Sequence, residues 1–143
     1  MPEQEKNAQE KVIVFSVGGQ DYCIPVLSVR EIRSYEEPTK LPFAAHYVKG
    51  AFNLRGVILT IVDLAALLGL TPEDQATTRI VIVVDVQDKL CGLVVDKVID
   101  MTDVDLSTMQ NITDCDNISG MCIIADRMTG AINLQSIMNA ISF

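Results

Sequence analysis

Two neighbouring β-rich segments limit the possible folds of this chain more than any other feature of its sequence. RIVIVVDV at residues 79–86 and LCGLVVDKVI at residues 90–99 are rich in β-branched residues and flank the polar residues Gln87-Asp88-Lys89. Apolar runs of this length joined by a short polar turn predict a β-hairpin. It is the clearest of several short strands along the chain.

The same pattern of short strand and turn recurs near both ends of the sequence. Two more hairpins are predicted, with their turns at residues 18–21 and 128–130. A short helix or helical turn is predicted at residues 27–35, and short helices are predicted at 64–70, ended by Gly69, and at 135–143. Many short strands at regular spacing with few helices indicate an all-β barrel or a pair of barrels.

In the middle of the chain the apolar period changes to two. Alternation predicts one strand face with Val48, Gly50, Phe52 and Leu54 and an opposite, more polar face with Lys49, Ala51, Asn53 and Arg55. Gly56 predicts a turn or bulge. Residues 57–62 are apolar at nearly every position, which predicts a strand buried on both faces.

Length and charge restrict the class of protein. A chain of 143 residues fits one compact domain or two small intertwined lobes. The net charge of −8 argues against nucleic-acid binding, which needs clustered Lys and Arg. The longest apolar stretch, residues 57–70, is shorter than the roughly 20 residues of a membrane-spanning helix. The polar residues 1–10 predict a flexible tail rather than a signal peptide, and residues 71–78 an exposed linker, so a cytoplasmic protein is expected.

Side chains with catalytic or metal-binding chemistry are few and dispersed. The four cysteines, Cys23, Cys91, Cys115 and Cys122, form no C-x-x-C pair and are predicted to be buried thiols. The single histidine, His46, has no nucleophile or carboxylate nearby in the sequence. The acidic stretch at 114–120 lacks the glycine and the bidentate glutamate of a calcium loop. We therefore expect no catalytic site, no metal and no cofactor.

A group of acidic residues begins near the end of the predicted hairpin at 79–99 and continues beyond it. Asp96, Asp100, Asp103 and Asp105 lie within ten residues of one another. No apolar pocket motif accompanies them that would raise a carboxyl pKa for acid catalysis. Two interpretations stay open, a solvated face of the protein and an electrostatic docking patch.

Three longer motifs carry a family resemblance. EIRSYEEPTKLP at 31–42, YVKGAFNLRGVILTIVDL at 47–64 and GLVVDKV at 92–98 closely resemble the CheW family of chemotaxis coupling proteins, over roughly residues 11–141. The resemblance implies a single domain, 11–143, of two SH3-like barrels with about five strands each, in lobes of roughly 11–78 and 79–143.

The resemblance also implies a function. CheW-like proteins are cytoplasmic adaptors without catalytic activity that are recruited to membrane receptor arrays. They join the cytoplasmic tip of methyl-accepting chemoreceptors to the regulatory domain of a CheA-type histidine kinase. No nucleic acid, cofactor or direct membrane insertion is expected. The residues that contact the kinase are not implied by the motifs.

By the same resemblance, a receptor-binding groove would be lined by Val29, Ile32, Gly50, Asn53, Arg55 and Val95. For Val29 and Ile32 the alternative is core packing, and for Gly50 it is a backbone conformation that needs glycine. Arg55 has a planar guanidinium that suits a partner's carboxylate, but it could also brace the barrel by pairing with Asp63 or Glu31.

Two positions depart from the family pattern. Thr60 stands where a proline is usual, and Ala45 near another. They leave open whether the protein serves flagellar chemotaxis or another chemosensory pathway. A second hypothesis, from a different class, is a β-barrel regulator that binds a small molecule between its lobes.

Overall fold

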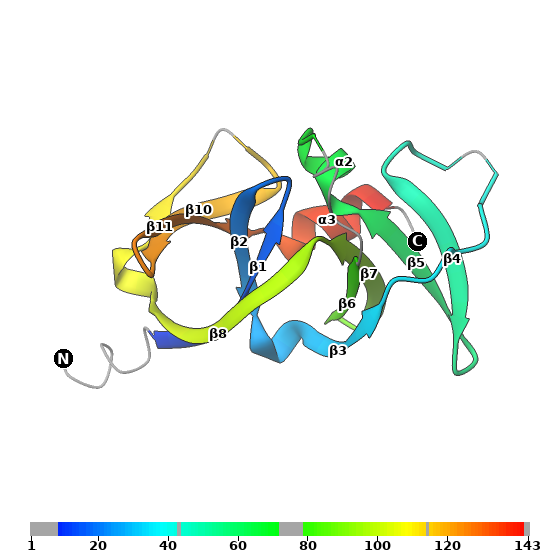
Figure 1. Cartoon of the computed structure of the whole chain (residues 1–143), viewed down its shortest axis with the longest axis horizontal. Coiled ribbons are helices and arrows are strands. Elements are labelled where there is room, and N and C mark those ends of the chain that lie inside the picture. The colour runs from blue at the N-terminus through cyan, green and yellow to red at the C-terminus, as the bar shows by residue number, and fades with distance from the viewer. Residues whose placement is uncertain (1–8, 43, 72–78, 114, 142–143) are drawn as a thin grey trace.

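The protein consists of two β-barrels, as expected, with short helices at their junction (Figure 1). The computed structural model describes residues 9–42, 44–71, 79–113 and 115–141. The first barrel has strand order β8-β1-β2-β11-β10-β9, and the second has β3-β6-β7-β5-β4. The strands of the first barrel are β1 (Gln9–Val17), β2 (Gln20–Pro25), β8 (Lys97–Asp105), β9 (Gln110–Asn111), β10 (Ile118–Ile124) and β11 (Arg127–Ile132).

The second barrel is built from the middle of the chain. Its strands are β3 (Val29–Ser34), β4 (Val48–Leu54), β5 (Val57–Asp63), β6 (Ile80–Val86) and β7 (Lys89–Val95). The first barrel therefore takes residues from both ends of the chain, and the sheet boundaries fall after β2 and after β7. A division into lobes at residue 78 does not match these boundaries, because strand pairing joins segments that are far apart in sequence.

Residue 78 instead separates two similar halves of the chain. Each half has an opening hairpin (β1–β2 or β6–β7), a single strand (β3 or β8), a second hairpin (β4–β5 or β10–β11) and a short helix, α2 (Leu64–Leu68) or α3 (Leu134–Ile141). The opening hairpin of each half completes the barrel of the other half through a parallel pairing, β2 with β11 and β7 with β5. The halves are thus intertwined.

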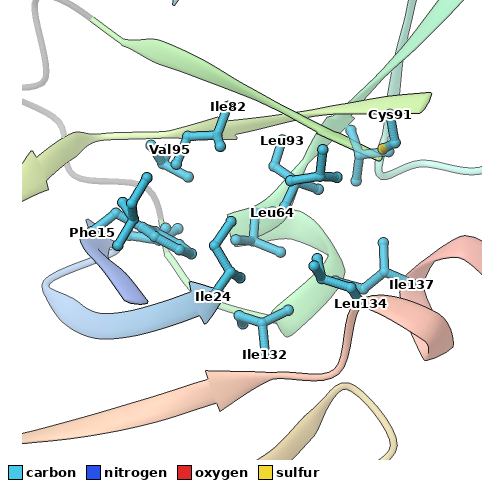
Figure 2. Packing of buried hydrophobic residues seen from close by; sticks show 14 of the residues in the cluster. Phe15, Ile24, Leu64, Ile82, Cys91, Leu93, Val95, Ile132, Leu134 and Ile137 are labelled. Atoms are coloured by element: carbon cyan, nitrogen blue, oxygen red, sulfur yellow. The ribbon is translucent and has the colours of Figure 1, made fainter. Parts of the chain in front are cut away.

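A shared hydrophobic core lies between the barrels and under the helices (Figure 2). It includes Phe15 and Ile24 from the first barrel, Ile82 and Leu93 from the second, and Ile137 from α3. Each barrel also has a small cluster inside it. Because alternate residues of β1 and β7 point into different clusters, these strands are buried on both faces.

The short helix or helical turn predicted at residues 27–35 is present only at its start, and the prediction is wrong from Val29 on. A 3₁₀ turn at Val26–Ser28 leads into strand β3, which pairs with β6. A β-bulge shifts the register between Val29 and Glu31, so that Val29 and Ile32 lie opposite Val84 and Ile82 on one face of the sheet. The bulge produces the three-residue spacing that the sequence pattern assigned to a helix.

Two more predictions need correction. Residues Val57 and Ile58 at the start of β5 are exposed, because the β4–β5 hairpin projects beyond the core, and only the later residues of β5 are buried. The last hairpin turns at Ala125 and Asp126, both with positive φ, rather than at 128–130. Thr129, in the middle of the predicted turn, lies within β11 and is buried, so this segment is part of a strand.

Several other predictions are confirmed. The hairpin β6–β7 turns at Gln87 and Asp88, and the hairpin β1–β2 turns at Gly18 and Gly19. Helix α2 ends at Gly69, whose φ of 72° is left-handed. The C-terminal helix is present as α3.

The predicted tail, residues 1–10, lies outside the described residues except for Gln9 and Glu10, which begin β1. The predicted linker at 71–78 also lies outside them, except for Thr71. Within the described chain, no helix has the length and apolar character needed to cross a membrane.

Candidate interaction surfaces

Arg55 occupies the tip of the β4–β5 hairpin rather than a strand face. Arg55 and Gly56 have φ values of 50° and 88°, as in the type I′ turn that two-residue hairpins favour. The N–H of Gly56 donates to Oδ1 of Asn53 at 2.7 Å, so Asn53 holds the turn. The sequence alternation therefore misplaced Arg55, because the strand ends at Leu54.

The guanidinium of Arg55 pairs with Glu31, one of the two internal partners that the sequence left open. Its NH2 nitrogen lies 2.6 Å from Oε1 of Glu31, and the two side chains are 70% and 27% exposed. Arg33 approaches the other oxygen of Glu31 at 3.9 Å and lies over the ring of Phe52 at 5.5 Å. These contacts join β3 to β4 and close the second barrel, since the two strands are opposite edges of its sheet.

Gly50 is needed by the backbone at this same closure. It is buried, its φ is 145°, and a Cβ atom there would lie 2.2 Å from the carbonyl oxygen of Thr39. Thr39 and Ala51 exchange two backbone hydrogen bonds, of 2.9 and 2.8 Å, which hold the loop between β3 and β4 against β4 and form the seam of the barrel. Of the two interpretations for Gly50, the backbone requirement accounts for what is observed.

Val29 and Ile32 lie on the face of the second barrel that turns toward the shared core. Val29 is half-buried against that core, while Ile32 is 45% exposed. Met101 of β8 pairs with the core residue Ile13, so it lies on the corresponding face of the first barrel, and it is 55% exposed. We refer to Val29, Ile32 and Met101 as the inter-barrel surface. Met101 has no signal in the sequence, because β8 reads there as a polar, acidic segment.

Val95 does not belong to a surface. It is 1% exposed and lies within the shared core, opposite Ile80 (Figure 2). Its position in GLVVDKV reflects packing, and a partner could reach it only by opening the core. Val95 is therefore not part of the inter-barrel surface.

A second exposed apolar surface was missed by sequence reasoning. Ile58 is 77% exposed, and with Val57 and Leu90 it borders a pocket of about 380 Å³ beside the β6–β7 turn. Arg30 and Asp85 form an ion pair at this pocket. We refer to Val57, Ile58 and Leu90 as the hairpin surface. Recognising a two-residue type I′ turn at Arg55-Gly56 in the sequence would have predicted that Ile58 lies near the projecting end of the hairpin.

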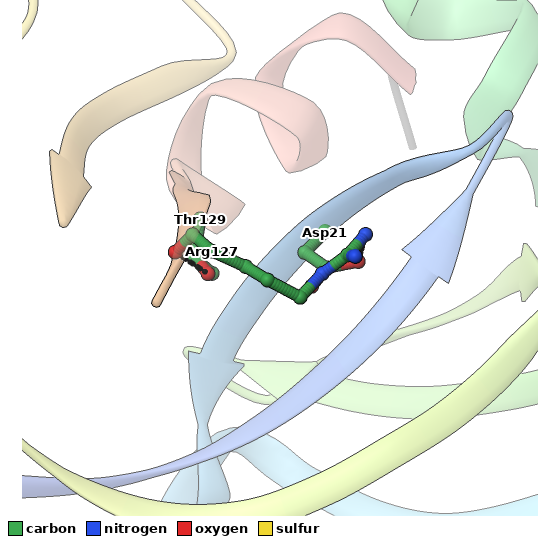
Figure 3. A network of polar contacts seen from close by, with 3 residues as sticks. All are labelled: Asp21, Arg127 and Thr129. Atoms are coloured by element: carbon green, nitrogen blue, oxygen red, sulfur yellow. Dashed lines mark hydrogen bonds and ion pairs between the residues drawn. The ribbon is translucent and has the colours of Figure 1, made fainter. Parts of the chain in front are cut away.

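The first barrel has an ion pair between a buried carboxylate and an exposed arginine of two neighbouring strands. Asp21, whose side chain is 4% exposed, accepts from Nε of Arg127 at 2.6 Å and from its NH2 nitrogen at 3.2 Å (Figure 3). These hydrogen bonds raise the pKa of Arg127. The pair ties the start of β2 to β11, next to the buried Thr129.

The acidic residues and cysteines have mainly structural surroundings. Asp96 is buried and accepts a hydrogen bond from the N–H of Gly18 at 2.9 Å, whereas Asp100, Asp103 and Asp105 are exposed.

Burial raises the pKa of Cys23 and of Cys91 to about 12, so both are neutral thiols. Cys122 is also buried, but Cys115 is exposed, contrary to the prediction, because it lies in the loop after β9.

Exposed His46 packs edge-on against Tyr47. Across the residues with described positions, no three His, Cys, Asp or Glu side chains are grouped to hold a metal ion. Two barrels with exposed apolar side chains at their rims are typical of a β-barrel interaction module.

Comparison with known proteins identifies the kind of module. The family model of the CheW-like domain matches residues 11–142. A probable CheW chemotaxis protein of Rhizobium etli is 43% identical over 91 residues, which cover 64% of this chain and 59% of that protein. The CheW chemotaxis protein of Rhizobium meliloti is 34% identical over 137 residues, covering 92% of this chain and 88% of that protein.

A solved structure agrees with the fold. The crystal structure of the scaffolding protein TtCheW from Thermoanaerobacter tengcongensis superposes with a TM-score of 0.81 at 25% identity, covering 87% of this chain and 84% of that one. This chain therefore belongs to the CheW-like family, whose members are chemotaxis scaffolding and coupling proteins.

Proposed function

We propose that this protein is a non-enzymatic adaptor that couples methyl-accepting chemoreceptors to a CheA-type histidine kinase. The observation that carries the proposal is the presence of two exposed apolar surfaces, the inter-barrel surface and the hairpin surface, on one small CheW-like chain. Exposed apolar side chains bordered by charges are typical of protein interfaces. The adaptor acts in the cytoplasm, at receptor arrays on the membrane.

The inter-barrel surface is the proposed receptor site. Val29, Ile32 and Met101 present apolar side chains from both barrels, and an amphipathic helical tip can bind such a surface by its apolar face. Arg55, with its side chain 70% exposed, supplies a cation for a carboxylate on the receptor. Asn53 and Gly50 act indirectly, by holding the turn and the barrel seam.

The hairpin surface is the proposed kinase site. Ile58 would provide its apolar centre, and the ion pair of Arg30 with Asp85 its polar rim. Through the contact of Arg55 with Glu31, the hairpin is joined to the strand that carries Ile32.

Co-sedimentation with a receptor signalling fragment and the kinase of the same cell, with kinase activity measured alongside, tests the proposal. A ternary complex with raised kinase activity is expected. Arg55→Glu should abolish complex assembly while the protein stays folded by circular dichroism. If a folded sample binds neither protein, the coupling function is wrong, and ligand screening would then test the small-molecule hypothesis.

A pair of matched variants separates the two surfaces. Ile58→Asp places a charge on the hairpin surface, and Ile123→Asp places one on the first barrel at a similarly exposed position. Loss of kinase binding is expected for the first variant only, with receptor binding retained. Equal losses in both variants would contradict the assignment of the kinase to the hairpin surface.

A further inference from the structure

Strand β8 presents a long edge without a neighbouring strand. It spans nine residues, and within the described ranges it forms ladder hydrogen bonds with β1 alone. In an antiparallel pair, alternate residues direct their N–H and C=O groups away from the partner strand. Figure 1 shows β8 crossing below β1 and β2 along the lower side of the first barrel. The outward edge of β8 is therefore an open template for another strand.

The corresponding edge strands in the second barrel are linked to each other. There the loop after β3 pairs with β4 through the hydrogen bonds between Thr39 and Ala51, and the side-chain contact of Arg55 with Glu31 joins the β4–β5 turn to β3. For β8, the described part of the chain supplies no such closure. One backbone N–H, that of Met101, is instead held at 2.8 Å by the carboxylate of Asp100 from the same strand.

The charges around β8 define what can bind there. The strand and the facing end of β1 carry two cations, Lys97 and Lys11, against four anions, Glu10, Asp100, Asp103 and Asp105. A second copy of this chain would bring the same acidic strand and be repelled. A segment that carries Lys or Arg is attracted, and its cations would also draw the carboxylate of Asp100 away from the N–H of Met101.

An apolar pocket lies directly beyond the end of β8. It has a volume of about 360 Å³ and is lined by Thr108, Gln110, Met121, Cys122, Ile123 and Met128. Thr108 belongs to the 3₁₀ turn that follows β8 immediately. A segment that pairs with β8 would thus reach this pocket and could seat one apolar side chain in it.

We propose that the free edge of β8 is a strand-addition site for an extended, positively charged segment of a partner protein. The main-chain groups of the segment pair with β8, its cations face the aspartates, and an apolar residue at one end occupies the pocket beside Thr108. This site is separate from the proposed kinase surface. It shares strand β8 with the proposed receptor surface, which uses the side chain of Met101, whereas strand addition uses the main-chain groups of β8 and the outer end of the first barrel.

The test uses the full-length protein and three synthetic peptides. The first is acetyl-Lys-Val-Lys-Val-Lys-Val-Lys-Leu-amide, the second replaces every lysine by glutamate, and the third is the basic peptide N-methylated at alternate residues. A second N-methylated version, shifted by one residue, covers both registers. Isothermal titration measures affinity, and amide hydrogen exchange maps the bound region.

The basic peptide should bind and slow exchange in β8, while the acidic peptide should not. One of the two N-methylated peptides should bind about tenfold more weakly, since several main-chain hydrogen bonds are lost. The proposal is overturned if the basic peptide does not bind at millimolar concentration, or if both N-methylated peptides bind as well as the parent, which would indicate charge attraction alone.

Two variants locate the site on the molecule. The double variant Asp100→Asn with Asp103→Asn keeps side-chain shape but removes two charges, and it should weaken the basic peptide several-fold. Asp116→Asn, an exposed acid of another loop, is the matched control and should leave the affinity unchanged. Equal effects of the two changes, or protection of amides elsewhere than in β8, would contradict the assignment.

Discussion

The two barrels have corresponding strand orders, with β9 added in the first, but they are filled in different ways. Each has three buried valines inside it. In the second barrel these are joined by Leu54, Leu59 and Ile61, with Tyr35, Phe52 and Leu90 at the edge. In the first they are joined by the smaller Cys23, Cys122 and Ala131, with Met109 and Ile124 at the edge. Burial of apolar area stabilises roughly in proportion to that area, so the second barrel contributes more to stability.

The barrels also differ in how their edges are treated. In the second barrel, backbone hydrogen bonds and a partly exposed ion pair link the two edge regions, whereas the ion pair of Asp21 in the first barrel joins β2 to β11, which are neighbours within the sheet, and among the described residues β8 has β1 as its only ladder partner. One architecture can thus serve two purposes. A well-filled, closed barrel holds the proposed partner surfaces in place, and a lightly filled barrel leaves an edge for binding.

The largest expected effect tests the difference in filling. Ile61→Ala removes a fully buried side chain from the second barrel and should lower the free energy of unfolding by about 2–5 kcal/mol. Val14→Ala in the first barrel removes less area and should cost about 1–2 kcal/mol. Urea denaturation measures both, and a larger loss for Val14→Ala would break the comparison.

Closure of the second barrel is tested next. Gly50→Ala forces a Cβ atom against the carbonyl of Thr39 at a positive φ, so a loss of roughly 1–3 kcal/mol is expected. Gly56→Ala is the matched control, because it also has a positive φ but open space around its Cα. Thermal denaturation should show the greater loss for Gly50→Ala. Equal losses would mean that φ strain alone, and not the seam, is responsible.

The two ion pairs offer a third comparison. Arg127→Met leaves the carboxylate of Asp21 buried without its cation, so it should lower the melting temperature clearly. Arg55→Asn removes an exposed pair, typically about 0.2–1 kcal/mol, and places a favourable residue in the type I′ turn. Arg55→Asn should therefore melt close to the unmodified protein. A greater loss for Arg55→Asn would give Arg55 the bracing role instead.

The smallest effect at neutral pH concerns the buried thiols. The pKa values of Cys23 and Cys91 are raised from 9.0 to about 12 by burial. Above pH 9 the unfolded chain loses these protons while the folded chain keeps them, so this contribution is intact below pH 9 and is lost as pH rises toward 12. The double variant Cys23→Ala with Cys91→Ala should show a shallower alkaline decline in stability. An identical decline would contradict the assigned burial.

Single variants divide this alkaline effect between the two regions. Cys23 lies inside the first barrel and Cys91 in the shared core, so each single variant should remove only part of the pH dependence. Cys115 is an internal reference, because it is exposed and should react with a thiol reagent first.

Much of the fold follows from local patterns in the sequence. The hairpins β6–β7 and β1–β2, the glycine that ends α2 and the apolar spacing of α3 depend on residues close together in the chain and were predicted correctly. The strand predicted over residues 90–99 ends at Val95, and residues 97–99 begin β8 of the other barrel. The family was also evident from motifs of contiguous residues, EIRSYEEPTKLP and NLRG among them.

The candidate site was harder to derive because it depends on distant contacts. A bulge opposite β6 turned an apparent helix into strand β3, and a turn of two residues moved Arg55 off the strand face. Whether Val95 or Ile58 is exposed depends on which segments cover them, and the sequence around each is equally apolar.

The sequence by itself thus determined most of the strands and turns and the membership in the CheW-like family, because backbone preferences and motifs act over a few residues. Only the tertiary structure decided which half of the chain completes which barrel, which partner Arg55 has, and which apolar residues remain at the surface. Those outcomes depend on pairing β2 with β11 and β7 with β5 across long separations, where burial is settled by neighbours that no local pattern specifies.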